Sequence, residues 1–246
     1  MSAIVPGDDR KGLRMRRLHV ALVLLSFGAG AADAFAFLAL SGTFTANMTG
    51  NLVLAAMFTK PGYVTTLLCA LVAIAAFAVV LYSGFRWTKN AGSAAASKRM
   101  SIRQLLVPSL LAQAVVVVLW LVVWRQLPLP VEFVVIALSA GALALQTVAA
   151  KKLTDIDGIT TTYVTGTLTT TMQALAERSD RGQGIRVLSI LALPAGAVAC
   201  TALLHLVPWA GPVLPFVITG VATAIAFAAE PPAGTPAPAP VGTPGA

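Results

Sequence analysis

Two short polar motifs stand among the most apolar stretches of the chain, NMTGN at 47–51 and YVTGT at 163–167. Threonine is a good helix N-cap and glycine permits a tight turn, so each motif predicts the start of a helix. A helix that begins inside a membrane directs unpaired N–H groups and a positive dipole end toward the membrane centre. Such an end favours an anion, a carboxylate or a carbonyl group. The candidate binding residues in the motifs are Asn47, Thr49, Gly50, Asn51, Thr165, Gly166 and Thr167.

Asp33 adds a charge to this pattern. It is the only acidic residue deep inside a predicted apolar segment, whereas Glu132 lies at the outer edge of another. A carboxylate at that depth costs about 3 kcal/mol on insertion scales, so we expect it to face the interior of a helix bundle. Three roles are open: Asp33 holds a proton, pairs with a polar group, or fixes the TG turn by accepting backbone N–H bonds. In the second half of the chain Gln146 occupies the corresponding place and would supply an amide.

The composition indicates an integral membrane protein. The chain has 246 residues, 57% hydrophobic and 11% charged, with a mean hydropathy of +0.84, whereas soluble domains carry about 25% charged residues. The apolar runs are continuous, which favours a helix bundle over a β-barrel. Cys69 and Cys200 lie in apolar runs without a disulfide or metal-binding pattern, so we expect no metal and no cofactor. Six segments are long enough to cross a bilayer: 18–40, 63–85, 104–124, 131–150, 186–207 and 210–229.

The positions of the basic residues predict the topology. Most of the 17 Lys and Arg residues fall in three clusters, before the first span, at 86–103 and at 151–186. All three clusters face the cytoplasm only if the stretches with the TG motifs, 43–59 and 160–177, do not cross the membrane. We therefore expect an all-α membrane protein with six transmembrane helices, two short re-entrant or discontinuous TG helices, and cytoplasmic N- and C-termini. Tryptophans fall near the predicted span ends, as anchors at the membrane interface do: Trp87, Trp120, Trp124 and Trp209.

The two halves of the chain show the same order of elements: a span, a TG insertion, and two further spans. Because each half contains three spans, the second half is inserted in the opposite orientation. This arrangement is an inverted 3+3 repeat, a plan typical of transporters. The chain then divides into a basic cytoplasmic N-terminus (1–17), a first membrane repeat (18–124), a second membrane repeat (125–229) and a Pro/Ala-rich tail that we expect to be disordered (230–246).

These motifs also carry a family resemblance. The stretch GAGAADAFAFLALSGTFTANMTGN, together with LALQTVAA and TTTYVTGTL, resembles the bacterial YoaK family of inner-membrane proteins, a domain of unknown function. The resemblance covers about residues 18–229. It implies a multi-pass protein of the bacterial inner (plasma) membrane and implies no particular activity. The tyrosine expected shortly after the Asp-Ala pair is replaced here by phenylalanine, Phe35 or Phe37, so no role of its hydroxyl is carried over.

Together these patterns favour a small transporter or channel with a midplane site between the two TG helices and Asp33 as a proton-coupling group. The expected partners are the lipid bilayer and a small solute that is anionic or carbonyl-bearing. One alternative is a membrane scaffold or assembly partner, in which threonine and glycine only let helices pack closely. A less favoured alternative is an intramembrane enzyme, because no nucleophile–base pair appears within the spans. We expect no enzymatic activity and no nucleic-acid partner, and the formation of a homo-oligomer is left open.

Overall fold

Helices make up all the regular structure in the computed structural model, which describes residues 6–89, 95–123, 126–154, 164–177 and 183–229. The long helices are α1 (Pro6–Ala39), α3 (Tyr63–Lys89), α4 (Ala95–Val123), α5 (Leu129–Thr154), α7 (Gln183–Leu206) and α8 (Val213–Ala228). The shorter ones are α2 (Met48–Ala56), α6 (Val164–Ala176) and the 3-10 turn η1 (Pro208–Ala210). The all-helical prediction is confirmed for these residues, and the tail at 230–246 lies outside them.

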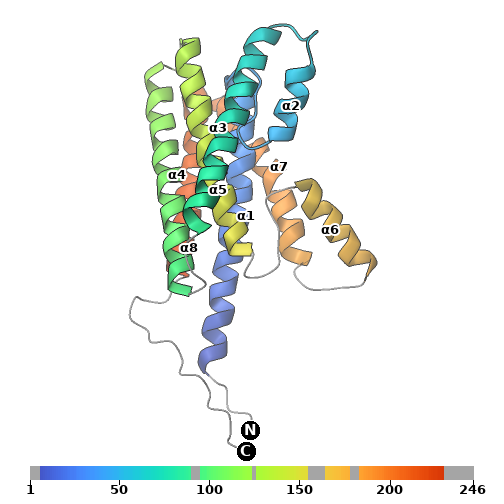
Figure 1. The fold of residues 1–246 in the computed structure, drawn as a ribbon, viewed down its shortest axis with the longest axis vertical. Helices are drawn as coiled ribbons and strands as arrows, with labels where there is room; N and C mark the ends of the chain where they lie inside the picture. Colours follow the sequence, from blue (N-terminus) through green and yellow to red (C-terminus); the bar gives the residue numbers. More distant parts are fainter. Residues whose placement is uncertain (1–5, 90–94, 124–125, 155–163, 178–182, 230–246) are drawn as a thin grey trace, which may run out of the picture.

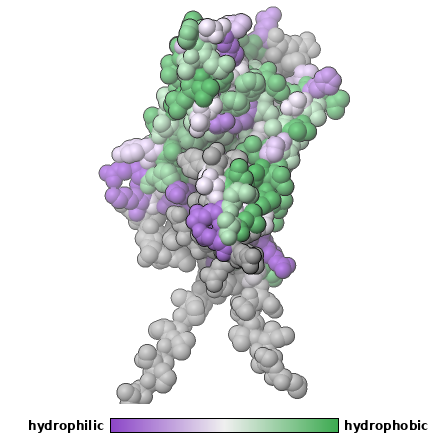
Figure 2. Space-filling view, turned by 90° about the vertical axis from the view of Figure 1, so that its right-hand side faces the viewer, coloured by the Kyte–Doolittle hydropathy of each residue, from purple (hydrophilic) through white to green (hydrophobic). Residues whose placement is uncertain are grey.

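Among the described residues, six helices are long and apolar enough to cross a membrane, as the sequence predicts. Many of their large apolar side chains are exposed, as expected of a surface that faces lipid. Figure 2 shows a large hydrophobic area over the upper part of one face, interrupted by a few hydrophilic patches. The membrane-spanning parts are Gly12–Ala39, Tyr63–Lys89, Ile102–Val123, Leu129–Lys152, Gly184–Leu206 and Pro208–Ala228.

The helices pack around α1 and α5. Helix α1 contacts α7 and α8, whereas α5 contacts α3 and α4; contacts of α4 with α8 and of α1 with α5 join the two groups. The short helices α2 and α6 pack on α3 and α7, respectively. Figure 1 shows α2 beside the upper part of the bundle, rising toward the top, and α6 beside the lower part, running downward. The two helices with the TG motifs therefore run toward opposite ends of the bundle.

Glycines let α1 and α7 approach each other closely. A Cβ atom on Gly30 would overlap the backbone carbonyl of Leu193, and a Cβ atom on Gly196 would overlap the carbonyl of Phe27. Small residues at helix contacts are common in membranes, where association depends on van der Waals packing rather than on the hydrophobic effect. The α1–α7 contact therefore requires glycine on both helices.

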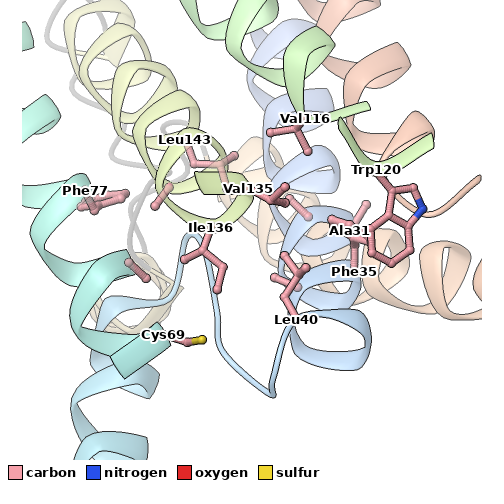
Figure 3. Close-up of a cluster of buried hydrophobic side chains, with 14 of the residues drawn as sticks. Ala31, Phe35, Leu40, Cys69, Phe77, Val116, Trp120, Val135, Ile136 and Leu143 are labelled. Carbon is pink, nitrogen blue, oxygen red and sulfur yellow. The ribbon is translucent and has the colours of Figure 1, made fainter. Parts of the chain in front are cut away.

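A buried apolar core fills the space between α1, α3, α4 and α5 (Figure 3). In this core Phe35 and Trp120 meet edge to face, with ring centroids 4.9 Å apart. Trp120 is only 5% exposed, and its Nε1 donates to the carbonyl of Trp209 at 3.1 Å. The prediction that Trp120 anchors the membrane interface is therefore wrong, because its N–H finds a partner inside the protein and its ring can be buried. Trp87 and Trp209 are exposed, and Trp124 lies outside the described residues.

Candidate functional site

A compact polar turn joins α1 to α2. It begins with two residues in the left-handed backbone conformation, Ser41 (φ 47°) and Gly42 (φ 71°), which reverse the chain at the end of α1. Thr43 is fully buried and donates its hydroxyl to the carbonyl of Leu40 at 2.9 Å. Thr45 is fully buried as well. The chain after α1 therefore turns back against the bundle before α2 begins.

Asp33 holds this turn from α1. Its Oδ1 accepts the backbone N–H of Thr45 at 2.8 Å and that of Ala46 at 2.7 Å. The Thr45 hydroxyl lies 3.5 Å from the same oxygen, which is a weak contact. Hydrogen bonds to a charged acceptor are stronger than neutral ones, so the carboxylate is a suitable anchor for two turn amides. Of the three roles that the sequence left open, this geometry corresponds to fixing the turn.

Asn51 holds the same turn from α2. Its side chain is fully buried, with Oδ1 accepting the Phe44 N–H at 2.9 Å and Nδ2 donating to the Phe44 carbonyl at 2.7 Å. One side-chain amide thus satisfies both backbone groups of one residue. Asp33 and Asn51 therefore fix three consecutive residues of the turn, 44 to 46, from two different helices.

Helix α2 is capped by Asn47 and not by the threonine of the TG motif. The Asn47 side chain accepts the Gly50 N–H at 3.0 Å. Thr49 lies in the first turn of the helix and is exposed. Gly50 lies against Phe44, since a Cβ atom there would come within 2.8 Å of the ring carbon Cδ2. The interpretation of threonine as the cap is wrong for this motif, because asparagine, an equally good capping residue, precedes it by two positions.

The second motif lies in α6. Thr167 is 1% exposed and so matches Asn51, the corresponding residue of α2, whereas Gly166 is exposed. Thr165 belongs to α6 by its backbone. The residues before α6, 155–163, lie outside the described residues. The two motifs therefore share a helical position and one buried residue.

Gln146 does not join Asp33 in one hydrogen-bonded group. Its Nε2 donates to the hydroxyl of Ser109 on α4 at 3.0 Å and to that of Thr219 on α8 at 3.3 Å. Ser109 in turn donates to the carbonyl of Ala142 at 3.0 Å. The structure thus brings Asp33, Asn47, Gly50 and Asn51 together at the turn and gives Gln146 a separate network that ties α5 to α4 and α8.

Glu132 is a buried acid that sequence reasoning missed. It lies in the first turn of α5, is 6% exposed, and its Oε1 has no hydrogen-bond partner among the described residues. The thiol of Cys69 on α3 is close enough to interact electrostatically with this carboxylate. The only sequence signal was an acid shortly after Pro128 and Pro130, which did not indicate the direction of its side chain. As for metals, the described residues contain no group of three or more His, Cys, Asp and Glu side chains placed to hold an ion.

Comparison with known protein families gives one match, over residues 21–226, to a family described as "Protein of unknown function (DUF1275)". The chain belongs to the DUF1275 family. The match extends from α1 to α8 and includes the polar turn, Gln146 and Glu132. Membership agrees with the resemblance to an uncharacterised family, and the six apolar helices make this DUF1275 protein a multi-pass membrane protein. No curated protein and no solved structure matches the chain.

Proposed function

We propose that this DUF1275 protein is a small-solute transporter or channel of the bacterial inner membrane, built as an inverted 3+3 repeat with cytoplasmic termini. The pairing of the helices carries the proposal. If α1 is exchanged with α5, α3 with α7 and α4 with α8, the α1–α7 contact becomes α5–α3, and α1–α8 becomes α5–α4. The contact of α2 with α3 becomes that of α6 with α7, while α4–α8 and α1–α5 map onto themselves. Such a pattern is expected of two structurally equivalent halves.

The glycines support the same exchange. Helices α1 and α7 approach at Gly30 and Gly196, and helices α5 and α3 approach at Gly141 and Gly84. A Cβ atom would lie 3.3 Å from a Val80 methyl at Gly141 and 3.1 Å from a methyl of the facing valine at Gly84. In each pair a glycine of one helix meets the partner helix. Inverted repeats of transporters place the binding site at the interface of the halves, near the midplane.

The proposed solute site lies between the N-terminal ends of α2 and α6. In Figure 1 each helix starts nearer mid-height of the bundle than it ends, so both positive dipole ends lie on the mid-height side. An anionic or carbonyl-bearing solute fits such ends. Asn47, Thr49 and Gly166 are the exposed candidates there, whereas Gly50, Asn51 and Thr167 would shape the helix starts. In this scheme Asp33 and Gln146 support the frame rather than contact the solute.

One observation favours a second function, a membrane scaffold or assembly partner. Asp33, Asn47 and Asn51 all bond to backbone groups of the turn or of α2 itself. Polar groups used in this way lock a bundle without binding a solute. A scaffold would then meet its partner through the basic segments predicted to face the cytoplasm.

Reconstitution into liposomes distinguishes the two functions. The purified protein is tested for flux of small anions, organic acids and neutral metabolites, with protein-free liposomes as the blank. Thr49→Glu places an acid in the first turn of α2, which suits the helix dipole but repels an anion. Thr59→Glu, at an exposed position in the α2–α3 connection, is the matched control. We expect the protein to carry at least one of these solutes, with a flux that Thr49→Glu lowers and Thr59→Glu leaves unchanged. If the protein carries none of the solutes, the scaffold function is favoured.

A further inference from the structure

Glu132 is a buried acid with one carboxyl oxygen, Oε1, that the fold leaves without a hydrogen bond among the described residues. Its side chain is 6% exposed, and Oε1 lacks a hydrogen-bond partner among the described residues. An acid in the first turn of a helix ordinarily accepts free backbone N–H groups there or stays in water. Oε1 of Glu132 is buried away from water and accepts no hydrogen bond from a described residue. A buried carboxylate without a partner is costly and in practice takes up a proton or a cation.

The surroundings of Glu132 favour the proton. Cys69 and the neighbouring residues Val135 and Ile136 belong to the apolar core between α1, α3, α4 and α5, and Figure 3 shows the Cys69 side chain pointing toward the turn after α1. The described residues contain no group of three or more His, Cys, Asp and Glu side chains placed to hold a metal ion, so a bound metal cation is less favoured here than a proton.

The charged and titratable groups of the packed elements complete the environment. On α3 the group facing Glu132 is Cys69. Before α3, Lys60 Nζ donates to the hydroxyl of Thr66 at 3.1 Å, one turn from Cys69. On α1 the nearest acid in the same half of the bundle is Asp33, whose Oδ1 is occupied by two turn amides. On α4, Arg103 lies near the opposite end of that helix, over the Phe227 ring.

We propose that Glu132 is a proton-exchange site at the end of the bundle where α5 begins, and that it, rather than Asp33, couples solute movement to protons. The coupling role rests on the proposed transport function, whereas the exchange site does not. In the exchange step the carboxylate oxygen takes a proton from a hydronium ion, forming an O–H bond and leaving water. The reverse step returns the proton to water, and no other bond changes.

Carbodiimide labelling tests the site on the wild-type protein. Dicyclohexylcarbodiimide modifies protonated carboxyl groups in apolar surroundings, and mass spectrometry locates the adduct. In proteoliposomes we expect the adduct on Glu132 and more of it at acidic than at alkaline pH. Glu177, an exposed acid bonded to Gln173 at 2.8 Å, is the internal control and should stay unmodified. Absence of the adduct from Glu132, or labelling that does not change with pH, would overturn the inference.

A second measurement separates this inference from the transport proposal. Glu132→Gln and the control Glu177→Gln are reconstituted with the pH dye pyranine inside the vesicles, and proton movement is followed while the solute panel is added. Solute-driven proton movement that Glu132→Gln abolishes and Glu177→Gln retains would support coupling at Glu132. Equal proton movement in both variants would refute it. Labelling does not require solute flux. An adduct on Glu132 in a protein that carries no solute would therefore support the exchange site and contradict the transport function.

Discussion

Replacing Asp33 with alanine removes the acceptor of two backbone N–H groups, those of Thr45 at 2.8 Å and Ala46 at 2.7 Å. A hydrogen bond to a charged group contributes about 1.5–3 kcal/mol, so the loss of two should lower the free energy of unfolding by about 3–6 kcal/mol. The Thr45 hydroxyl at 3.5 Å is too distant to add to this value. In a protein of this size each kcal/mol changes the melting temperature by about 2–4 °C, so we expect a decrease of at least about 6 °C.

The assay is the tryptophan fluorescence of detergent-purified protein during heating, with size-exclusion chromatography to measure the folded fraction. Asp33→Asn keeps a carbonyl oxygen in place, so its decrease should be about half as large, since neutral hydrogen bonds are weaker. Glu177→Ala removes an exposed acid and serves as the control. If Asp33→Ala melted at the wild-type temperature, the carboxylate would not be holding the turn.

Three further contacts are tested by substitution, with comparison variants for the first two. Asn51→Ala leaves the part-buried N–H and carbonyl of Phe44 unpaired and should lower the free energy of unfolding by about 2–5 kcal/mol. The cap variant Asn47→Ala should lower it by about 1 kcal/mol, and equal melting temperatures of the two variants would contradict this. Gly196→Ala should abolish monodisperse elution, whereas Gly12→Ala, with nothing within 4 Å of the new Cβ, should elute like the wild type. Gln146→Leu should destabilise by about 1–2 kcal/mol in the same melting assay, and an unchanged melting temperature would show that its two bonds add nothing.

The spans could be predicted from the sequence because length and apolar character are local properties. The predicted segments 63–85 and 131–150 lie inside α3 (Tyr63–Lys89) and α5 (Leu129–Thr154). The short stretches 43–59 and 160–177 contain α2 and α6, because each has a polar start followed by a brief apolar run. What the sequence could not give was the packing of α1 on α7, since Gly30 and Gly196 are far apart along the chain.

The candidate site was less accessible to sequence reasoning. The depth of Asp33 follows from its place in an apolar run, but its partners depend on a turn that folds back over α1. Asn47 and Thr49 are both acceptable caps, and only the backbone path selects Asn47. Glu132 lies at the start of a helix, where an acid usually faces water, and its burial results from packing against α3. In each case the local sequence pattern allowed more than one role for the side chain, and a contact with a residue distant in the sequence determined which role it has.

The orientation of the two halves is the central claim, and thiol labelling measures it most directly. In a protein whose buried Cys69 and Cys200 are replaced with alanine, single cysteines are introduced by Thr59→Cys, before α3, and Gly184→Cys, at the start of α7. Both positions are exposed and correspond in the two halves. An inverted repeat predicts that a membrane-impermeant maleimide labels Thr59→Cys in intact cells and Gly184→Cys only after permeabilisation. Labelling of both variants from the same side of the membrane would contradict the inverted repeat.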